Sequence, residues 1–154
     1  MDNNFTCGVC GAKNYRKFSE MLYICVDCSH VFSDIKYNEE VKIDYVDGKM
    51  KIEIFISDNL LEKYEKDSVS QVEIYQTLEY IKHPQAFLHD LYRVCSEGCE
   101  GTIYLQKGGA FKNYFSSDKV AQMLKISGFE VEKINFFKKL ANIINKKIII
   151  KFKK

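Results

Sequence analysis

The sequence contains one proline and no tryptophan, and among its 23 basic residues only Arg16 and Arg93 are arginine. Arginine forks are the usual means of recognising nucleic acid and carboxylates, so their scarcity argues against both kinds of ligand. The formal net charge is only +2, which gives no strong excess of the sign that a polyanion would attract. Nucleic acid stays an open alternative, but it is not the favoured partner.

Long hydrophobic runs are also missing. No apolar stretch approaches the roughly 20 residues that a membrane-spanning helix needs, and the start, Met1-Asp2-Asn3-Asn4, lacks the basic and apolar regions of a signal peptide. Cysteine pairs without a secretion signal are typical of a reducing compartment and of metal binding. We therefore expect an intracellular, cytoplasmic protein with no membrane partner, and the Lys-, Ile- and Asn-rich composition also fits a viral or phage source.

Four cysteines occupy the first 28 residues as two Cys-x-x-Cys pairs, Cys7/Cys10 and Cys25/Cys28. Two such pairs at this separation can fold over one another and place four thiolates around one tetrahedral Zn²⁺. The alternatives are a pair of disulfides or four unrelated thiols, but unrelated thiols would not be expected to pair twice at the same spacing. His30 follows the second pair, and we expect it to support the ligands or to lie at the surface, because four cysteines already fill a zinc site.

The chain divides into three predicted parts: a zinc ribbon (1–37), a β-hairpin with a linker (38–66) and an α/β domain (67–154). In the ribbon, residues 15–18 and 21–24 suit two short strands. Apolar residues alternate over 41–46 and 51–56, on either side of Asp47-Gly48, which predicts a hairpin with a tight turn. Residues 58–66 suit one or two helical turns.

The third part alternates between strand and helix patterns. Pro84 opens an amphipathic helix that Gly98 should end, and the Ser116-Ser117-Asp118 run caps a second helix that Gly128 should end. Strands are predicted at 71–75, 101–106, 129–136 and 147–152. This order predicts a small α/β (α+β) fold with two main helices and a hairpin at the end of its sheet.

Several segments of this part resemble class I S-adenosylmethionine (SAM)-dependent methyltransferases. The resemblance lies in Leu78-Glu79-Tyr80-Ile81-Lys82-His83-Pro84, in Arg93-Val94 with the turn up to Gly101, and in Gly128-Phe129-Glu130-Val131. Cys28-Ser29-His30-Val31-Phe32 is similar to the end of the four-cysteine ribbons that precede such domains in bacterial and viral relatives. The resemblance covers roughly residues 1–37 and 67–152 and implies a reduced Rossmann-like half-sheet.

The cofactor-binding half of that family is missing from this sequence. None of the eight glycines forms the Gly-x-Gly loop that lets a backbone approach SAM, and only about 30 residues separate the ribbon from the strand at 71–75. The resemblance therefore implies that SAM is not bound and that the protein is more plausibly a pseudoenzyme than an enzyme. An incomplete sheet would expose the strand at 71–75, so the hairpin at 41–56, a second copy or a protein partner should cover that edge.

Two other functions stay open at this point. One is a SAM-dependent methyltransferase completed by oligomerisation or by a partner chain. The other is a nucleic-acid-binding ribbon, in which Tyr15, Phe18 and Tyr23 stack on bases despite the nearby Glu20 and Asp27.

Other reactive side chains receive structural interpretations. Glu79, His83 and His89 could form an acid/base group, but Pro84 interrupts their helical spacing, so we predict scaffold and surface positions and no catalytic residue. Cys95 and Cys99 are predicted to be buried thiols rather than a redox pair or a second metal site. The lysines near the end are predicted to protect a sheet edge rather than to bind phosphate. They are Lys146, Lys147, Lys151, Lys153 and Lys154.

Overall fold

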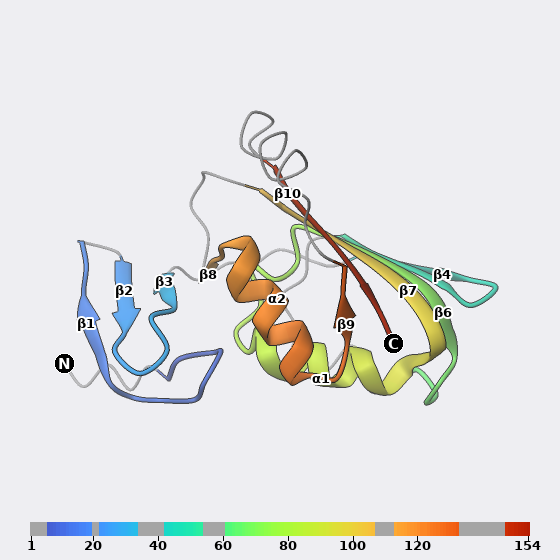
Figure 1. Cartoon of the computed structure of the whole chain (residues 1–154), viewed down its shortest axis with the longest axis horizontal. Helices are drawn as coiled ribbons and strands as arrows, with labels where there is room; N and C mark the ends of the chain where they lie inside the picture. The colour runs from blue at the N-terminus through green and yellow to red at the C-terminus, as the bar shows by residue number, and fades with distance from the viewer. Residues whose placement is uncertain (1–5, 20–21, 34–41, 54–60, 107–112, 133–146) are drawn as a thin grey trace.

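The computed structural model describes residues 6–19, 22–33, 42–53, 61–106, 113–132 and 147–154 (Figure 1). Two sheets and two helices make up this part of the chain. The small sheet has the order β1-β2-β3-β8 and the large sheet the order β4-β5-β6-β7-β10-β9. The elements are β1 (Tyr15–Lys17), β2 (Leu22–Cys25), β3 (Val31–Ser33), β4 (Lys42–Val46), β5 (Lys49–Glu53), β6 (Val69–Tyr75), α1 (Pro84–Val94), β7 (Cys95–Gln106), β8 (Asn113–Tyr114), α2 (Ser117–Ile126), β9 (Glu130–Val131) and β10 (Lys147–Lys153).

The large sheet confirms the predicted α/β fold class and shows what covers the strand at 71–75. β6 is parallel to β7 on one side and to β5 on the other, with Ile52 opposite Ile74. β5 is the second strand of the predicted hairpin, and its turn residues Asp47 and Gly48 both have positive φ, as a type I′ turn requires. The hairpin therefore covers the edge of β6, and β4 becomes the outer strand.

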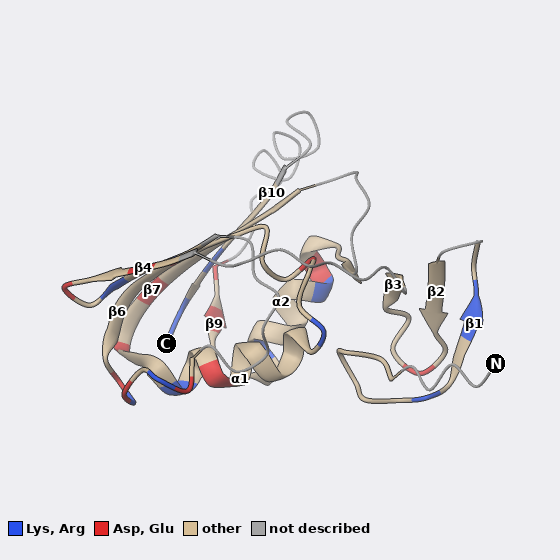
Figure 2. Cartoon of the chain, turned by 180° about the vertical axis from the view of Figure 1, so that it is seen from behind, with Lys and Arg blue, Asp and Glu red and all other residues tan. Residues whose placement is uncertain are grey.

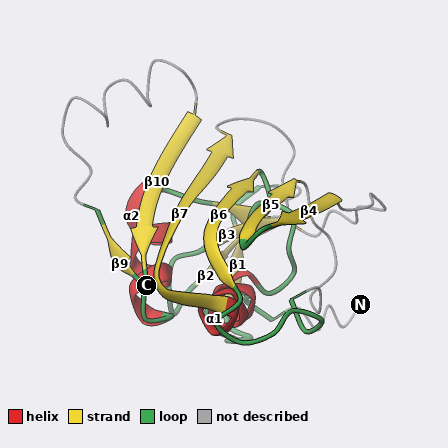
Figure 3. Cartoon of the chain, turned by 90° about the vertical axis from the view of Figure 1, so that its right-hand side faces the viewer, coloured by secondary structure: helices red, strands yellow, loops and turns green. Residues whose placement is uncertain are grey.

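Both helices pack against the same face of the large sheet (Figures 1 and 3). Each contributes its predicted apolar face to one core, in which Leu88, Leu91 and Leu124 are fully buried. Along β6, β7 and β10, alternate residues such as Ile74, Ile103 and Ile150 point into this core, as the two-residue period of a strand requires. Burial of such side chains, about 1.5–3 kcal/mol each, stabilises this part of the molecule.

The helix boundaries follow local signals at three of their four ends. Pro84 begins α1, the Ser116 hydroxyl accepts a hydrogen bond from the Lys119 N–H at the start of α2, and Gly128, with φ 106°, follows the end of α2. The predicted stop at Gly98 is wrong. α1 ends at Val94 and β7 begins at once, so Gly98, with φ 76°, lies within β7 at a register shift opposite Val69–Gln71.

Two other predicted elements differ from the structure, and two observed strands were not predicted. One or two helical turns were predicted at 58–66. Residues 61–67 form turns rather than helix, and residues 58–60 lie outside the described residues. The strand predicted at 129–136 is the short β9, and residues 133–136 also lie outside the description. β3 and β8 were not predicted, because three residues and two residues are too few to show a strand period.

The ribbon and the α/β domain share a sheet. β3 of the ribbon pairs with β8, which lies between β7 and α2 in the sequence. Gly8 of the first cysteine pair lies so close to the Lys82 carbonyl that a Cβ there would clash with it, and the Lys119 ammonium donates to the Cys28 carbonyl. The division into three parts at 1–37, 38–66 and 67–154 stays a prediction, but these contacts join the ribbon directly to the larger domain.

Candidate metal centre

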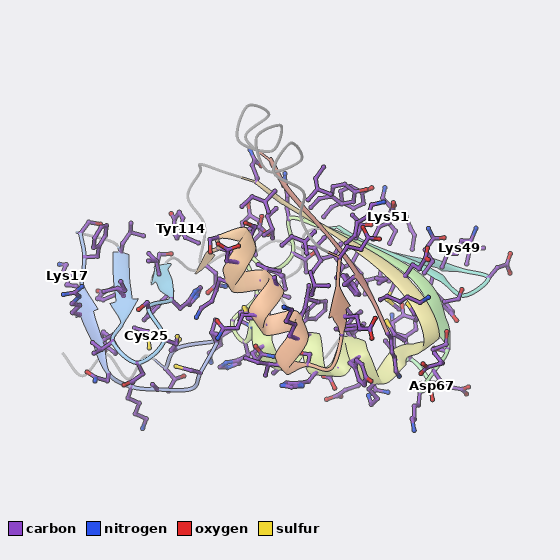
Figure 4. The ribbon with its side chains drawn as sticks, viewed as in Figure 1. Lys17, Cys25, Lys49, Lys51, Asp67 and Tyr114 are labelled. Carbon is purple, nitrogen blue, oxygen red and sulfur yellow. The ribbon has the colours of Figure 1, made fainter. Side chains whose placement is uncertain are left out.

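The structure brings together the sulfurs of Cys7, Cys10, Cys25 and Cys28, all within 4.8 Å of one another. Cys7 Sγ lies 3.6 Å from Cys28 Sγ, and Cys10 Sγ lies 3.6 Å from Cys25 Sγ. All four residues are free thiols. The cluster joins the two Cys-x-x-Cys turns across β1 and β2 (Figure 4, where Cys25 is labelled).

These separations fit a zinc ion. A tetrahedral site with Zn–S bonds of about 2.3 Å places its sulfurs about 3.8 Å apart. The observed distances of 3.6 Å are close to that value. Four thiolates would also fill the coordination sphere, which is the pattern of a structural site and leaves no position for a reacting water.

The backbone of each Cys-x-x-Cys turn is arranged to support a thiolate. Burial raises the pKa of Cys7, although the N–H groups of Cys10 and Val9 donate to its sulfur and oppose that rise. At Cys25 burial acts in the same direction, but N–H groups of Cys28 and Asp27, together with hydrogen bonds from the thiols of Cys10 and Cys28, outweigh it and lower the pKa below its ordinary value. N–H groups aimed at sulfur stabilise the charged form that a metal requires.

His30 is not part of this cluster and does not lie at the surface, so the surface position allowed for it is wrong. It is 1% exposed, and its ring stacks on Phe115 with centroids 4.9 Å apart. Its Nε2 lies 3.0 Å from Asn113 Oδ1. Burial lowers the pKa of His30 to about 4, so the ring is neutral at physiological pH. His30 thus packs between the ribbon and the α/β domain.

Asn113, in β8, is the partner that the sequence did not reveal. Its side-chain amide donates to the carbonyls of Leu78 and Ile81 at 3.1 and 2.7 Å, which leaves Oδ1 to accept from His30. The proton on His30 is therefore on Nε2. A lone asparagine carries no pattern that distinguishes it from a turn residue, so no sequence signal could have found it.

Glu79 is buried, contrary to the surface position predicted for it. It is 2% exposed and lies beyond the end of β6, where its Oε1 accepts a hydrogen bond from the Gln106 N–H at 2.8 Å. Among the described residues, its Oε2 has no hydrogen-bond partner. Burial raises the pKa of Glu79 to about 7, because the charged carboxylate loses hydration that the backbone N–H groups of Gln106 and of Glu79 itself do not replace.

The other two members of the considered acid/base group are elsewhere. His83 is the N-cap residue of α1 and makes no side-chain capping bond, whereas His89 is exposed, with Nε2 3.4 Å from the Gln85 amide. No hydrogen bond joins Glu79, His83 and His89 in the described part of the chain. The structure does not assemble these three residues into a catalytic group.

The remaining thiols and lysines have structural positions. Cys95 and Cys99 are fully buried, as predicted, and a hydrogen bond between their side chains raises the pKa of Cys95 and lowers that of Cys99. Lys154 is inside rather than at an edge: its ammonium donates to Asp67 and to the carbonyls of Tyr92 and Cys95. β10, which carries Lys147, Lys151 and Lys153, lies between β7 and β9, and Lys146 lies outside the described residues.

A shallow hollow of about 520 Å³ lies along α2 and is lined by residues of that helix. This hollow does not resemble a cofactor-binding pocket, because residues of a single helix line it and do not enclose a ligand. Within the described residues, no helix combines the length and the apolar character needed to cross a membrane.

No protein-family model matches the sequence, and a comparison with curated proteins gives no significant match. Several solved structures similar to part of the chain are SAM-dependent methyltransferases. One from Aquifex aeolicus has 18% identity and a TM-score of 0.48, and the match covers 59% of this chain and 48% of that one. One from Archaeoglobus fulgidus has 11% identity, a TM-score of 0.48 and coverage of 63% and 64%.

A third such structure, from Mesorhizobium loti, has 13% identity, a TM-score of 0.47 and coverage of 61% and 67%. The chain thus spans about half to two thirds of the length of these proteins. Similarity of this extent assigns no activity to the chain. The functional conclusions below depend on the residues themselves.

Proposed function

We propose that this protein is a zinc-stabilised, non-catalytic protein-interaction component. The observation that carries the proposal is the cluster of four cysteine sulfurs within 4.8 Å of one another. Cys7, Cys10, Cys25 and Cys28 would hold one Zn²⁺, which contributes folding energy to a ribbon too small to fold on its own core. The ion would not take part in a reaction, because four thiolates leave it no open position.

Two features support the absence of methyl transfer. The sequence has no Gly-x-Gly loop, which is the element that brings the backbone close to SAM in the methyltransferases that the chain resembles. In addition, the hairpin β4–β5 occupies the sheet position beside β6. In a parallel sheet that binds a cofactor, that position would instead belong to a strand connected through a helix.

The contacts between the ribbon and the α/β domain support a fixed two-part body. β3 pairs with β8, His30 is buried against Asn113, and Lys119 donates to the Cys28 carbonyl. Such a body presents its outer strands in a defined geometry. We infer that a protein partner uses one of these edges, since an edge strand offers unpaired backbone groups in a row.

The test is a titration of the zinc-loaded protein with SAM and with S-adenosylhomocysteine, after metal analysis of the purified protein. We expect one equivalent of zinc and no heat of binding at millimolar ligand. Micromolar binding of either compound would overturn the non-catalytic proposal and would favour a methyltransferase completed by a second chain. A protein that contains no zinc after expression in zinc-supplemented medium would overturn the metal assignment.

A further inference from the structure

The small sheet has two end strands, β1 and β8, and β1 is the end strand that belongs to the ribbon. Arg16 is paired with Ile24, the Phe18 N–H donates to the Leu22 carbonyl, and the Val26 N–H donates to the Asn14 carbonyl. In an antiparallel pair, residues bonded to the partner strand alternate with residues whose backbone groups point away. The N–H and C=O of Lys17 therefore point to the open side.

The described residues of β1 and the turn before it carry charge of one sign. The described ribbon residues include three basic ones, Lys13, Arg16 and Lys17, all exposed, and one acidic one, Asp27. Figure 2 shows the basic colour along β1. Arg16 is one of only two arginines in the whole chain, and guanidinium groups bind carboxylates in a bidentate manner.

An exposed apolar side chain lies at the end of the same edge. Phe18 is 67% exposed, the highest value among the large hydrophobic residues of the described chain. Aromatic side chains surrounded by polar neighbours are common anchors in protein interfaces. Phe18 and the cations beside it together form what we call the β1 edge: Lys13, Arg16, Lys17 and Phe18.

β4, one of the two outer strands of the large sheet, lacks this combination. β4 and its turn carry charges of both signs, Lys42, Asp44 and Asp47, and the Tyr45 hydroxyl donates to the Ser68 carbonyl. Mixed charges protect an edge against pairing but do not select a partner by its charge.

We propose that the β1 edge binds an acidic, extended segment of a partner protein by adding it to the ribbon sheet as a further strand. Backbone hydrogen bonds would supply affinity, carboxylates facing Arg16 and Lys17 would supply selectivity, and an apolar residue would cover Phe18. A second copy of this chain is disfavoured as the occupant, since antiparallel β1–β1 pairing would bring Arg16 and Lys17 against their own copies. This inference rests on the proposed interaction function and names its site and partner chemistry.

The test uses zinc-loaded, full-length protein and a labelled eight-residue peptide with pairs of adjacent glutamates between valines, so that carboxylates lie on both faces of the added strand. Binding is followed by fluorescence anisotropy. The double variant Arg16→Glu/Lys17→Glu should raise the dissociation constant about tenfold or more, because two attractive pairs become repulsive. The control Lys63→Glu/Lys66→Glu makes the same change in net charge at exposed positions beside Asp67, at the opposite end of the molecule from Lys17 (Figure 4), and should leave binding unchanged.

Three further probes separate the explanations. A peptide N-methylated at alternate residues should lose binding, because it cannot form the backbone bonds of an added strand. A peptide with lysine in place of glutamate should not bind. A labelled thymidine oligonucleotide should not bind either; if it binds and the acidic peptide does not, the edge is a nucleic-acid surface and the peptide proposal is wrong.

Absence of acidic-peptide binding, or equal binding by the Arg16→Glu/Lys17→Glu variant, would also overturn the inference. Neither result contradicts the proposed function as long as SAM does not bind, because the partner protein could then bind to a different sheet edge. SAM binding would overturn the proposed function whatever the peptide does.

Discussion

Among the described residues of the ribbon, the buried apolar ones are Cys7, Cys25 and Phe32, whereas the larger domain buries side chains from four strands and both helices. Two of the three ribbon residues belong to the sulfur cluster. The ribbon therefore has almost no core apart from its candidate metal site, and the larger domain has a core that needs no metal. The comparison teaches that two parts of one chain can depend on different physical terms: metal coordination in one and hydrophobic burial in the other.

Removal of cysteines from the sulfur cluster should unfold the ribbon, and this is the largest expected loss of stability. We expect Cys10→Ser/Cys25→Ser to lose zinc, and with it roughly 10–16 kcal/mol of apparent binding free energy. The far-ultraviolet circular dichroism of α1 and α2 should remain, while hydrogen exchange should quicken in β1–β3 and in β8. Cys99→Ala, outside the cluster, is the control and should keep one equivalent of zinc. Retention of zinc by the double variant would contradict the ligand assignment.

Removal of a core side chain should affect the other part instead. Leu88 is fully buried in α1, and Leu88→Ala should lower the free energy of unfolding by about 2–5 kcal/mol, through lost burial and the cavity that remains. Urea denaturation measures this change. His89→Ala, an exposed position on the same helix, should change it by less than about 0.5 kcal/mol. Zinc content should be unchanged below the unfolding midpoint; its loss there would show that the ribbon depends on this core.

Glu79 gives the α/β domain a pH dependence of a definite sign. Its pKa in the folded protein is raised to about 7, so the folded state holds the proton more tightly than the unfolded state. The resulting stability is complete below the ordinary value of about 4.5 and is lost as pH rises through about 7. Glu79→Gln keeps an acceptor for the Gln106 N–H and cannot ionise, so its advantage over the wild type should grow from pH 5 to 8.

That advantage should reach roughly 3 kcal/mol in urea denaturation, with the order of magnitude set by the pKa change. Protonation of the cluster thiols affects both proteins equally, so it cancels in the difference between their free energies of unfolding. Glu97→Gln changes an exposed position in β7, and the free energy of unfolding of this variant should depend on pH as that of the wild type does. Parallel curves for Glu79→Gln as well would show that Glu79 is not buried as the structure places it.

The junction between the two parts should give the smallest effect and the sharpest test of their coupling. Asn113→Ala removes two donated hydrogen bonds and the acceptor of His30. It should lower the free energy of unfolding by about 1–3 kcal/mol. A double-mutant cycle with His30→Ala should show an interaction energy of about 0.5 kcal/mol or more. Strictly additive effects would mean that the ribbon and the domain are not joined through this pair.

Local chemistry explains which elements could be predicted. The Cys-x-x-Cys spacing, the Asp47-Gly48 turn, Pro84 at a helix start and the Ser116 cap each act within a few residues, so the sequence displays them directly. The stop at Gly98 failed because a positive φ serves a strand irregularity as well as a helix end, and neighbouring strands decide between them.

The environments of His30 and Glu79 could not be predicted, because each depends on residues far away in the sequence. His30 is buried by Asn113 and Phe115, more than eighty residues further on, through the pairing of β3 with β8. Glu79 is buried where the ends of β6 and β7 meet, and its partner is Gln106. From sequence alone, a charged or polar residue is predicted to lie at the surface, because only the packing of other elements shows whether it is buried.

The sequence by itself determined the four thiols, the hairpin and the two amphipathic helices, since these follow from spacing and period over short stretches. The tertiary structure alone decided that the hairpin covers β6, that both helices share one face of the sheet and that β1 is left as a cationic edge. Strand order is a long-range property: it is set by which apolar faces can be buried together, and no local pattern encodes that choice.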